Sequence, residues 1–318
     1  MPEWLIERGI GETRAVLIEG GEIVEARVQL DGVTPAGSVI AARLTSIGTN
    51  GRNAIATNQQ GIEYLLPRGA AAVTEGAPLT IEVTRETIPG TEPWKRPLAK
   101  MTDQAGRSAP ELEGKELPFP APQDRLAAAG WNDLLEDARS GIVRFNGGEL
   151  RISPTPAMAL IDVDGTLSPG DLAVRGAAEA AKAICRLDIG GSIGIDLPTS
   201  GSKMARQKAA EAIDKHLSQP FERTAVNGFG FVQIVRPRQR ASLVELAQDR
   251  APFEARALLR RAAFEAAGAK RLVAHPAVLA VLGGRKDWTE TLSRQVGGPI
   301  ELRADAALPM SGGYAEKL

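Results

Sequence analysis

The stretch that decides the fold is AMALIDVDGTLSPGDLAVRGAAEAAKAICRLDIGGSIGIDLP, residues 157–198. Two short apolar runs end in acids, at Asp162 and at Asp196, and a segment with helical spacing, 171–187, lies between them. A second helical segment follows at 203–217. This β-α-β-α order predicts an α/β unit whose two strands are parallel neighbours joined by a right-handed crossover.

Asp162 and Asp196 are the first candidates for chemistry, because open α/β sheets bind ligands at the carboxyl ends of adjacent parallel strands. Two carboxylates held close together repel each other unless a cation lies between them. Mg²⁺ is commonly held by one or two carboxylates with waters and substrate phosphates. We therefore expect a magnesium site, with Asp164 as an auxiliary ligand. The structural alternative is that each aspartate caps the helix or turn that follows it.

The N-terminal third of the chain has the pattern of β structure. Residues 3–30 contain three Val- and Ile-rich runs separated by glycine turns, which predicts a three-stranded meander. Residues 38–102 continue with short strands at the spacing typical of a barrel, so we expect a small five-stranded OB-type barrel. The polar, proline-rich stretch 102–123 lacks apolar periodicity and is predicted to be a linker.

Beyond this linker the pattern mixes helices and strands. Residues 124–140 have helical spacing, and 141–153 predict a hairpin that turns at its Asn-Gly-Gly sequence. Residues 223–236 predict two strands that meet at an Asn-Gly turn. Two helices over 241–268 and a small α/β unit over 270–303 complete the expected elements.

The composition excludes several classes of protein. Apolar residues make up 43% and charged residues 24%, so a disordered, collagen-like or coiled-coil chain is not expected. The single cysteine, Cys185, forbids an intramolecular disulfide and, with only two histidines, cannot complete a Cys/His zinc site. No run approaches the length of a membrane span and no signal peptide is evident, which predicts a cytoplasmic protein without membrane contact.

The charges are segregated along the chain although the net charge is only −1. Residues 203–271 hold fourteen basic and seven acidic side chains. A basic patch beside a carboxylate metal site suits a phosphodiester substrate, because Lys and Arg neutralise backbone phosphates. The alternative is a solvated helix face. The cations that we expect to contact RNA are Arg206, Lys208, Arg236, Arg238 and Arg240.

The histidines and two phenylalanines are further candidates for site residues. His216 and His275 match no recognisable site, and they are expected at a helix end and a strand end, so cleavage by a histidine pair has little support. Phe229 and Phe231 alternate along one strand and suit stacking on bases, but packing in the core is the role expected for them.

Four segments in this order resemble the catalytic region of the RNase E/G family of bacterial endoribonucleases: GELRISPTPAMALIDVD, AAEAAKAICRLDIGGSIGIDLP, RQKAAEA and TAVNGFGFVQIVRPRQR. The opening LIERGIGETRAVLIEGGEIVEARVQL resembles the N-terminal strands of that family, and the β segment after it stands where the family inserts its RNA-binding OB-type domain. The resemblance covers most of residues 3–245 and is strong only in 150–240. It implies Mg²⁺-dependent hydrolysis of single-stranded RNA, in which a metal-activated water attacks phosphorus and leaves a 5′-phosphate and a 3′-hydroxyl.

The resemblance also assigns residues. Asp162 and Asp196 match the two metal-binding aspartates of the family, while Asp164 stands where the family usually has Asn and adds a third carboxylate beside the predicted metal. The other matches are the Gln and basic residues of the following helix and of the run after the Phe-Gly strand: Gln207, Lys208, Arg238, Gln239 and Arg240.

The chain departs from the family pattern in four ways. The domain that senses a 5′-monophosphate has no counterpart, so end-sensing is not predicted. The loop GTLSPGDLA is short and lacks the basic residues of the family. The two-cysteine zinc link is absent, so we expect a monomer or homodimer and no zinc-linked tetramer. Tyr64 is the only aromatic residue between Ser38 and Pro89, so base stacking on the barrel would be weak.

We therefore expect a mixed α/β (α+β) chain with an inserted barrel and an RNase E/G-like catalytic domain. Its five parts are an N-terminal β segment of the catalytic body (1–35), an OB-type barrel (36–102), a linker (103–123), an α/β catalytic domain (124–245) and a small C-terminal α/β domain (246–318).

Two other functions stay open. The run LIDVDGTL also resembles the first motif of haloacid-dehalogenase-type phosphatases, with Asp162 as nucleophile and Asp164 as acid/base. This alternative leaves the β front end and the NGFGFVQIVRPRQR segment unexplained. A protein that binds RNA and cleaves it weakly or not at all is the other alternative, since the loop is short and the sensor is missing. The later phosphatase motifs would come from Thr199 or Ser200, Lys203 and Asp287.

Overall fold

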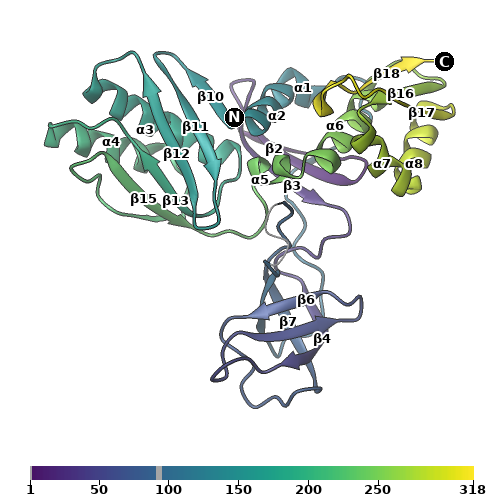
Figure 1. The fold of residues 1–318 in the computed structure, drawn as a ribbon, viewed down its shortest axis with the longest axis horizontal. Helices are drawn as coiled ribbons and strands as arrows, with labels where there is room; N and C mark the ends of the chain where they lie inside the picture. Colours follow the sequence, from purple (N-terminus) through teal and green to yellow (C-terminus); the bar gives the residue numbers. More distant parts are fainter. Residues whose placement is uncertain (1, 91–94) are drawn as a thin grey trace.

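Three hydrophobic cores organise the residues described by the computed structural model, which are 2–90 and 95–318. Figure 1 shows the parts built on them: a sheet with helices at the left, a small barrel at the bottom and a C-terminal unit at the right, with the N-terminal strands between them. The mixed α/β class expected from the sequence is confirmed.

The N-terminal segment forms the predicted meander. β1 (Glu3–Arg8), β2 (Glu12–Glu19) and β3 (Glu22–Leu30) pair antiparallel in chain order. The expected linker contains one more strand, because β9 (Lys115–Leu117) returns from the barrel and pairs parallel with β1. A three-residue strand leaves no periodicity in the sequence, so this pairing was not foreseen.

The second core lies inside the barrel. Its five strands close in the order β4-β5-β6-β8-β7, which confirms a small five-stranded barrel. Alternate residues such as Leu44, Tyr64 and Ile81 fill its interior. The strands are β4 (Val39–Ser46), β5 (Ala54–Asn58), β6 (Glu63–Leu66), β7 (Pro78–Arg85) and β8 (Leu98–Met101).

The first and largest core lies under a six-stranded sheet of order β10-β11-β12-β13-β15-β14. The predicted β-α-β-α unit is its centre, where β12 and β13 are parallel neighbours. The strands are β10 (Ile142–Phe145), β11 (Gly148–Pro154), β12 (Ala159–Gly165), β13 (Gly191–Asp196), β14 (Glu222–Arg223) and β15 (Phe231–Arg236). The helices are α1 (Arg125–Ala128), α2 (Trp131–Ser140), α3 (Pro169–Arg186), α4 (Lys203–His216) and α5 (Leu243–Gln248).

The two faces of this sheet differ. Ile161 and Val163 of β12 and Ile193 and Ile195 of β13 are buried in the core that α2, α3, α4 and α5 share. The residues that alternate with them form what we call the open face, which is largely exposed to solvent over the described residues. The open face consists of Arg144, Glu149, Arg151, Ser153, Leu160, Asp162, Asp164, Ser192, Gly194, Asp196, Glu222, Phe231, Gln233 and Val235.

The C-terminal unit has its own core and a three-stranded sheet of order β17-β16-β18. It begins with α6, because α5 packs into the first core through Leu243 and Leu246. The expected boundary at residue 245 therefore lies within α5. The elements are α6 (Arg250–Phe264), β16 (Lys270–Ala274), α7 (Pro276–Gly284), α8 (Lys286–Val296), β17 (Ile300–Ala304), the 3-10 turn Met310–Gly312 and β18 (Tyr314–Lys317).

A buried network of charged side chains joins the C-terminal unit to the N-terminal sheet. Arg14 donates to Glu7 and Glu12, both at 2.8 Å. Arg256 donates to the other oxygen of Glu12 at 2.8 Å, and Arg260 donates to both oxygens of Glu7. All five side chains are buried, so each charge depends on the others for stabilisation.

The barrel contacts the amino end of the sheet. Lys95 Nζ donates to the carbonyl of Pro156 at 2.9 Å, and the backbone N–H of Glu86 donates to the carbonyl of Gln239 at 2.8 Å. Pro156 precedes β12, so the barrel contacts the sheet at the amino ends of β12 and β13, opposite their carboxyl ends. Among the described helices, none has the length and apolar character needed to cross a membrane.

Candidate functional site

Asp162 and Asp196 lie side by side on the open face. They are Cα partners in the parallel pairing of β12 with β13, and both are exposed. Residues in register on neighbouring strands project from the same face of a sheet. The backbone register therefore confirms that these two positions lie together at the carboxyl ends of β12 and β13.

Local sequence explains why both aspartates face solvent. In β12 the buried Ile161 and Val163 flank Asp162, and in β13 the buried Ile195 precedes Asp196. Side chains alternate between the faces of a strand, so burying the branched residues under the helices directs the acids outward. Asp164 lies two residues after Asp162 and shares its face.

The register extends the pair into a row across four strands. Arg151 of β11 is the Cα partner of Asp162, and Phe231 of β15 is the Cα partner of Asp196. The row therefore runs Arg151, Asp162, Asp196, Phe231. The side chain of Arg151 is 56% exposed and forms an ion pair with Glu149 at 2.6 Å.

Mutual repulsion marks this group of acids. Partial burial, and then the negative charges of Asp164 and Asp196, raise the pKa of the Asp162 carboxyl. The backbone N–H of Val163 and the charge of Arg151 oppose this rise. Neighbouring carboxylates attract a cation, because a bound cation removes their repulsion.

Two helices begin at the carboxyl edge of β12 and β13. Ser168 caps α3 by accepting from the N–H of Asp171, and Ser202 caps α4 by accepting from the N–H of Ala205. Among the predicted RNA contacts, two lie on α4. Arg206 donates to the carbonyl of Ser200 at 2.8 Å, while Lys208 is exposed; Lys203, in the first turn, is also exposed.

The three other predicted RNA contacts lie elsewhere. Arg236 pairs in register with Gly191 at the start of β13, five residues and about 16 Å from Asp196. Its guanidinium donates to the carbonyls of Ile184 and Ile189. The structure therefore does not bring Arg236 to the edge that holds the two acids.

Arg238 and Arg240 likewise have structural partners. Arg238 forms an ion pair with Glu245 of α5, and Arg240 forms one with Asp188 at 3.4 Å. All three arginines of this run are partly buried. Of the five expected RNA contacts, only Arg206 and Lys208 lie on the helix that follows β13, because the arginines after β15 bind structural partners.

The two phenylalanines depart from the core role expected for them. Phe229, in the loop before β15, is 81% exposed, and Phe231 lies on the open face in register with Asp196. Alternation along the strand indicated a shared orientation for these residues but not which face they take. In the barrel, by contrast, Tyr64 is buried and donates to Thr34, so it offers no ring to a ligand.

Sequence reasoning also missed Arg151, Glu149 and Phe231 as neighbours of the acids. The alternation of Glu149, Arg151 and Ser153 with buried Leu150 and Ile152 marks one polar face of β11. That pattern was available in the sequence. The pairing of β11 and β15 on either side of the parallel strands was not, because antiparallel register depends on tertiary contacts.

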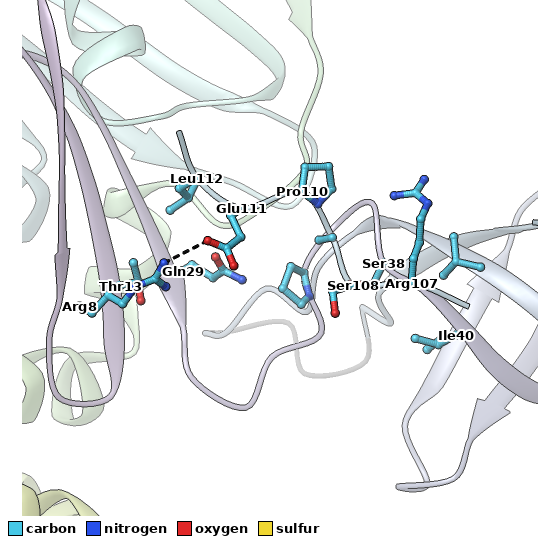
Figure 2. A pocket seen from close by; sticks show the side chains of 13 residues that line it. Arg8, Thr13, Gln29, Ser38, Ile40, Arg107, Ser108, Pro110, Glu111 and Leu112 are labelled. Atoms are coloured by element: carbon cyan, nitrogen blue, oxygen red, sulfur yellow. Dashed lines mark hydrogen bonds and ion pairs between the residues drawn. The ribbon is translucent and has the colours of Figure 1, made fainter. Parts of the chain in front are cut away.

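A hollow of about 480 Å³ lies between the barrel and the meander, away from the acids (Figure 2). Arg8 crosses it to Glu111 at 3.3 Å, and Arg107 donates to the carbonyl of Gly37 and to Gln104. Arg8 and Glu111 pair with each other and Arg107 binds neutral acceptors, so we interpret this hollow as the contact region between the barrel and the meander and not as the reactive site.

The remaining candidate residues have structural roles. His216 ends α4, and the His275 ring accepts from the N–H of Ala277 at the start of α7, so neither joins the acids. Asp287, which the phosphatase alternative requires, lies in α8 and pairs with Arg285. It belongs to the C-terminal unit, so the later phosphatase motif is not assembled beside Asp162.

The donor set fits one particular kind of metal site. Within residues 2–90 and 95–318, no group of three or more His, Cys, Asp or Glu residues is arranged to hold a metal ion. These residues therefore do not form a site in which protein ligands alone would coordinate Zn²⁺ or Ca²⁺. Two in-register carboxylates that face solvent fit Mg²⁺, which keeps several waters and binds through one or two carboxylates.

Comparison with known proteins gives no family. No family model matches the chain, and no curated protein matches it. The resemblance to the RNase E/G family therefore stays a prediction from the sequence.

Proposed function

We propose that the protein is a Mg²⁺-dependent endoribonuclease that hydrolyses single-stranded RNA. The observation that carries this proposal is the register pairing of Asp162 with Asp196 on the open face. When bound between them, Mg²⁺ would supply Lewis-acid stabilisation of negative charge at a phosphate. The sequence resemblance to RNase E/G endoribonucleases supports the same assignment.

The chain's own residues would bind and orient the RNA. Asp162 and Asp196 hold the cation, while the exposed Arg151 neighbours Asp162 in the same row and is suited to bind a phosphate of the substrate. Lys203 and Lys208 of α4 are exposed cations for flanking phosphates. Arg206 would act indirectly, by holding the loop after β13 through the carbonyl of Ser200.

Single-stranded RNA is the favoured substrate because of what surrounds the acids. An exposed sheet face with the Phe231 ring beside Asp196 suits unstacked bases, whereas the bases of a duplex are already stacked and paired. The closed barrel abuts the amino end of the same sheet, and small barrels of this kind commonly bind single strands. RNA that crosses the open face would therefore reach both parts.

A second candidate, an RNA-binding protein without efficient cleavage, is favoured by one observation. The described residues contain no group of three or more metal-ligating side chains, so the protein offers only a weak hold on a cation by itself. In this case the open face would bind RNA, and the carboxylates would serve only to tether Mg²⁺ that accompanies the phosphates.

The test is a cleavage assay with a single-stranded, A/U-rich RNA and Mg²⁺. We expect the wild type to produce fragments with a 5′-phosphate, and Asp162→Asn and Asp196→Asn each to lower the rate at least about 100-fold. Asp103→Asn is the matched control, since it removes the same charge from an exposed position outside the site. RNA binding without cleavage would replace the nuclease by the second candidate, and equal cleavage by all variants would contradict the site.

A further inference from the structure

We propose that Phe229 and Phe231 form a stacking platform for the bases of RNA next to the scissile phosphate. This inference rests on the proposed function and adds to it the residues that would hold the bases. Phe229 is 81% exposed, the largest exposed fraction among the large apolar side chains that are exposed in the described structure. A phenylalanine ring left in water forgoes the stabilisation that burial of its apolar surface would give.

The loop that carries Phe229 is fixed by hydrogen bonds. The side-chain oxygen of Asn227 accepts from the N–H of Phe229 at 2.9 Å and from the N–H of Phe231 at 3.0 Å. The hydroxyl of Thr199, in the loop after β13, donates to the carbonyl of Phe229 at 3.0 Å. The ring is therefore presented by an ordered backbone, which lowers the entropy lost when a ligand binds.

A glycine completes this arrangement. Gly230 has φ +93° and its carbonyl accepts from the N–H of Leu197, directly after Asp196. A side chain at this position would collide with the carbonyl of Leu197. The loop with the exposed ring is thus bound closely to the end of the strand that carries Asp196.

Phe231 extends the platform along the open face. It is the Cα partner of Asp196, and its ring lies across Gly194, where an added Cβ would stand 2.6 Å from the Phe231 ring and 3.0 Å from Leu160. Gly194 therefore leaves room for an apolar floor made by Phe231 and Leu160. Leu160 and Gly194 lie two residues along their strands from Asp162 and Asp196.

The charges of the open face favour a nucleotide over a second copy of this chain as the occupant. Its carboxylates outnumber its cations: Glu149, Asp162, Asp164, Asp196 and Glu222 stand against Arg144 and Arg151. A two-fold contact between copies would bring two negatively charged faces together, which is repulsive. A nucleic acid arrives with divalent cations that neutralise the acids, and its bases supply flat apolar surfaces for the rings.

The test uses a short single-stranded RNA that carries 2-aminopurine, and proteins in an Asp162→Asn background so that the RNA stays intact. Stacking on an aromatic ring quenches 2-aminopurine fluorescence.

Because base stacking on an aromatic side chain is worth about 1–3 kcal/mol, Phe229→Ala should weaken RNA binding about 5- to 100-fold and restore the fluorescence. Phe229→Trp should keep both affinity and quenching, whereas Phe229→Leu should lose them. Tyr314→Ala, which removes an exposed ring from the C-terminal unit, is the control and should change neither.

The outcomes separate this inference from the proposed function. If the wild type cleaves RNA but Phe229→Ala and Phe229→Leu bind it as tightly as the parent, the stacking role is wrong and the nuclease stands. If Phe229→Ala instead converts a dimer to a monomer at unchanged RNA affinity, the occupant is a second copy and the inference is overturned. If the wild type neither binds nor cleaves RNA in the presence of Mg²⁺, the proposed function fails, and the platform fails with it.

Discussion

Asp162 and Asp196 are Cα partners on two parallel strands, and both lie on the solvent-exposed face of the sheet. Partial burial, and then the negative charges of Asp164 and Asp196, raise the pKa of Asp162. Nothing in the packing of the sheet requires acids there, because the core is formed by the alternate residues Ile161 and Ile195. A cation held by the pair, as we propose, would remove the repulsion between these carboxylates.

Replacing Asp162 by Asn should stabilise the metal-free protein at neutral pH. A carboxyl whose pKa is raised by folding contributes stability below the pKa of the unfolded chain, about 3.9, and loses it as the pH rises through the folded value. At pH 7 the wild type therefore carries the repulsion that Asn removes. We expect a gain below about 1 kcal/mol, since exposed charges are screened by solvent.

Urea unfolding of both proteins in EDTA measures this difference. The gain should be present at pH 7 and should shrink as the pH is lowered toward 4. A variant less stable than the wild type at pH 7 would show that Asp162 supports the fold and would argue against a site strained by like charges.

Replacing Glu12 by Gln should destabilise the protein by about 3–5 kcal/mol, because the buried Arg14 and Arg256 would lose the charge that stabilises them. Burial raises the pKa of Glu12, but the two guanidiniums outweigh that effect and the net pKa is lowered. The stability that Glu12 contributes is therefore present above its unfolded pKa, near 4.5, and is lost as the pH falls through its folded value.

Urea unfolding at pH 7 gives the size of this effect. Glu19→Gln, which neutralises an exposed glutamate on the same strand, is the control and should change stability by less than about 0.5 kcal/mol. Similar effects of the two substitutions would mean that the buried network contributes little to joining α6 and β2.

Arg151→Ala should weaken RNA binding, whereas Arg238→Ala should leave RNA affinity unchanged and lower stability. Arg151 is exposed in the row that holds the acids, but Arg238 is paired with Glu245. Binding measured over a series of salt concentrations separates the two, because losing one phosphate contact lowers the salt slope by about 1. If Arg238→Ala lowers that slope and Arg151→Ala does not, the arginines after β15 bind RNA. The proposed RNA site at the carboxyl ends of β12 and β13 would then be wrong.

Much of the fold follows from local patterns in the sequence. The β-α-β-α order, with two apolar runs that end in acids, sufficed to predict β12 and β13 as parallel neighbours, and the crossover helix begins within two residues of the expected position. Glycine turns predicted the meander and the barrel because each turn needs a residue with freedom at positive φ. These features depend on residues that are close in the chain.

What the sequence did not predict depends on distant contacts. β9 pairs with β1 across more than 100 residues, and the neighbours of the acids on β11 and β15 are set by antiparallel register. A count of basic residues located a cationic segment but could not show that β15 runs antiparallel to β13. Arg236 therefore lies at the end of the sheet opposite the two acids, where it was not expected. Alternation alone likewise could not predict that Phe229 lies exposed in the loop before β15.

The most direct test of the account is a Mn²⁺ titration of the wild type, Asp162→Asn, Asp196→Asn and the control Asp103→Asn, followed by electron paramagnetic resonance in the absence of RNA. The account predicts that Mn²⁺ binds the wild type and the control, that Mg²⁺ displaces it, and that each site variant binds it at least about tenfold more weakly. Equal Mn²⁺ affinity in all four proteins, or no binding to the wild type, would contradict a cation shared by Asp162 and Asp196.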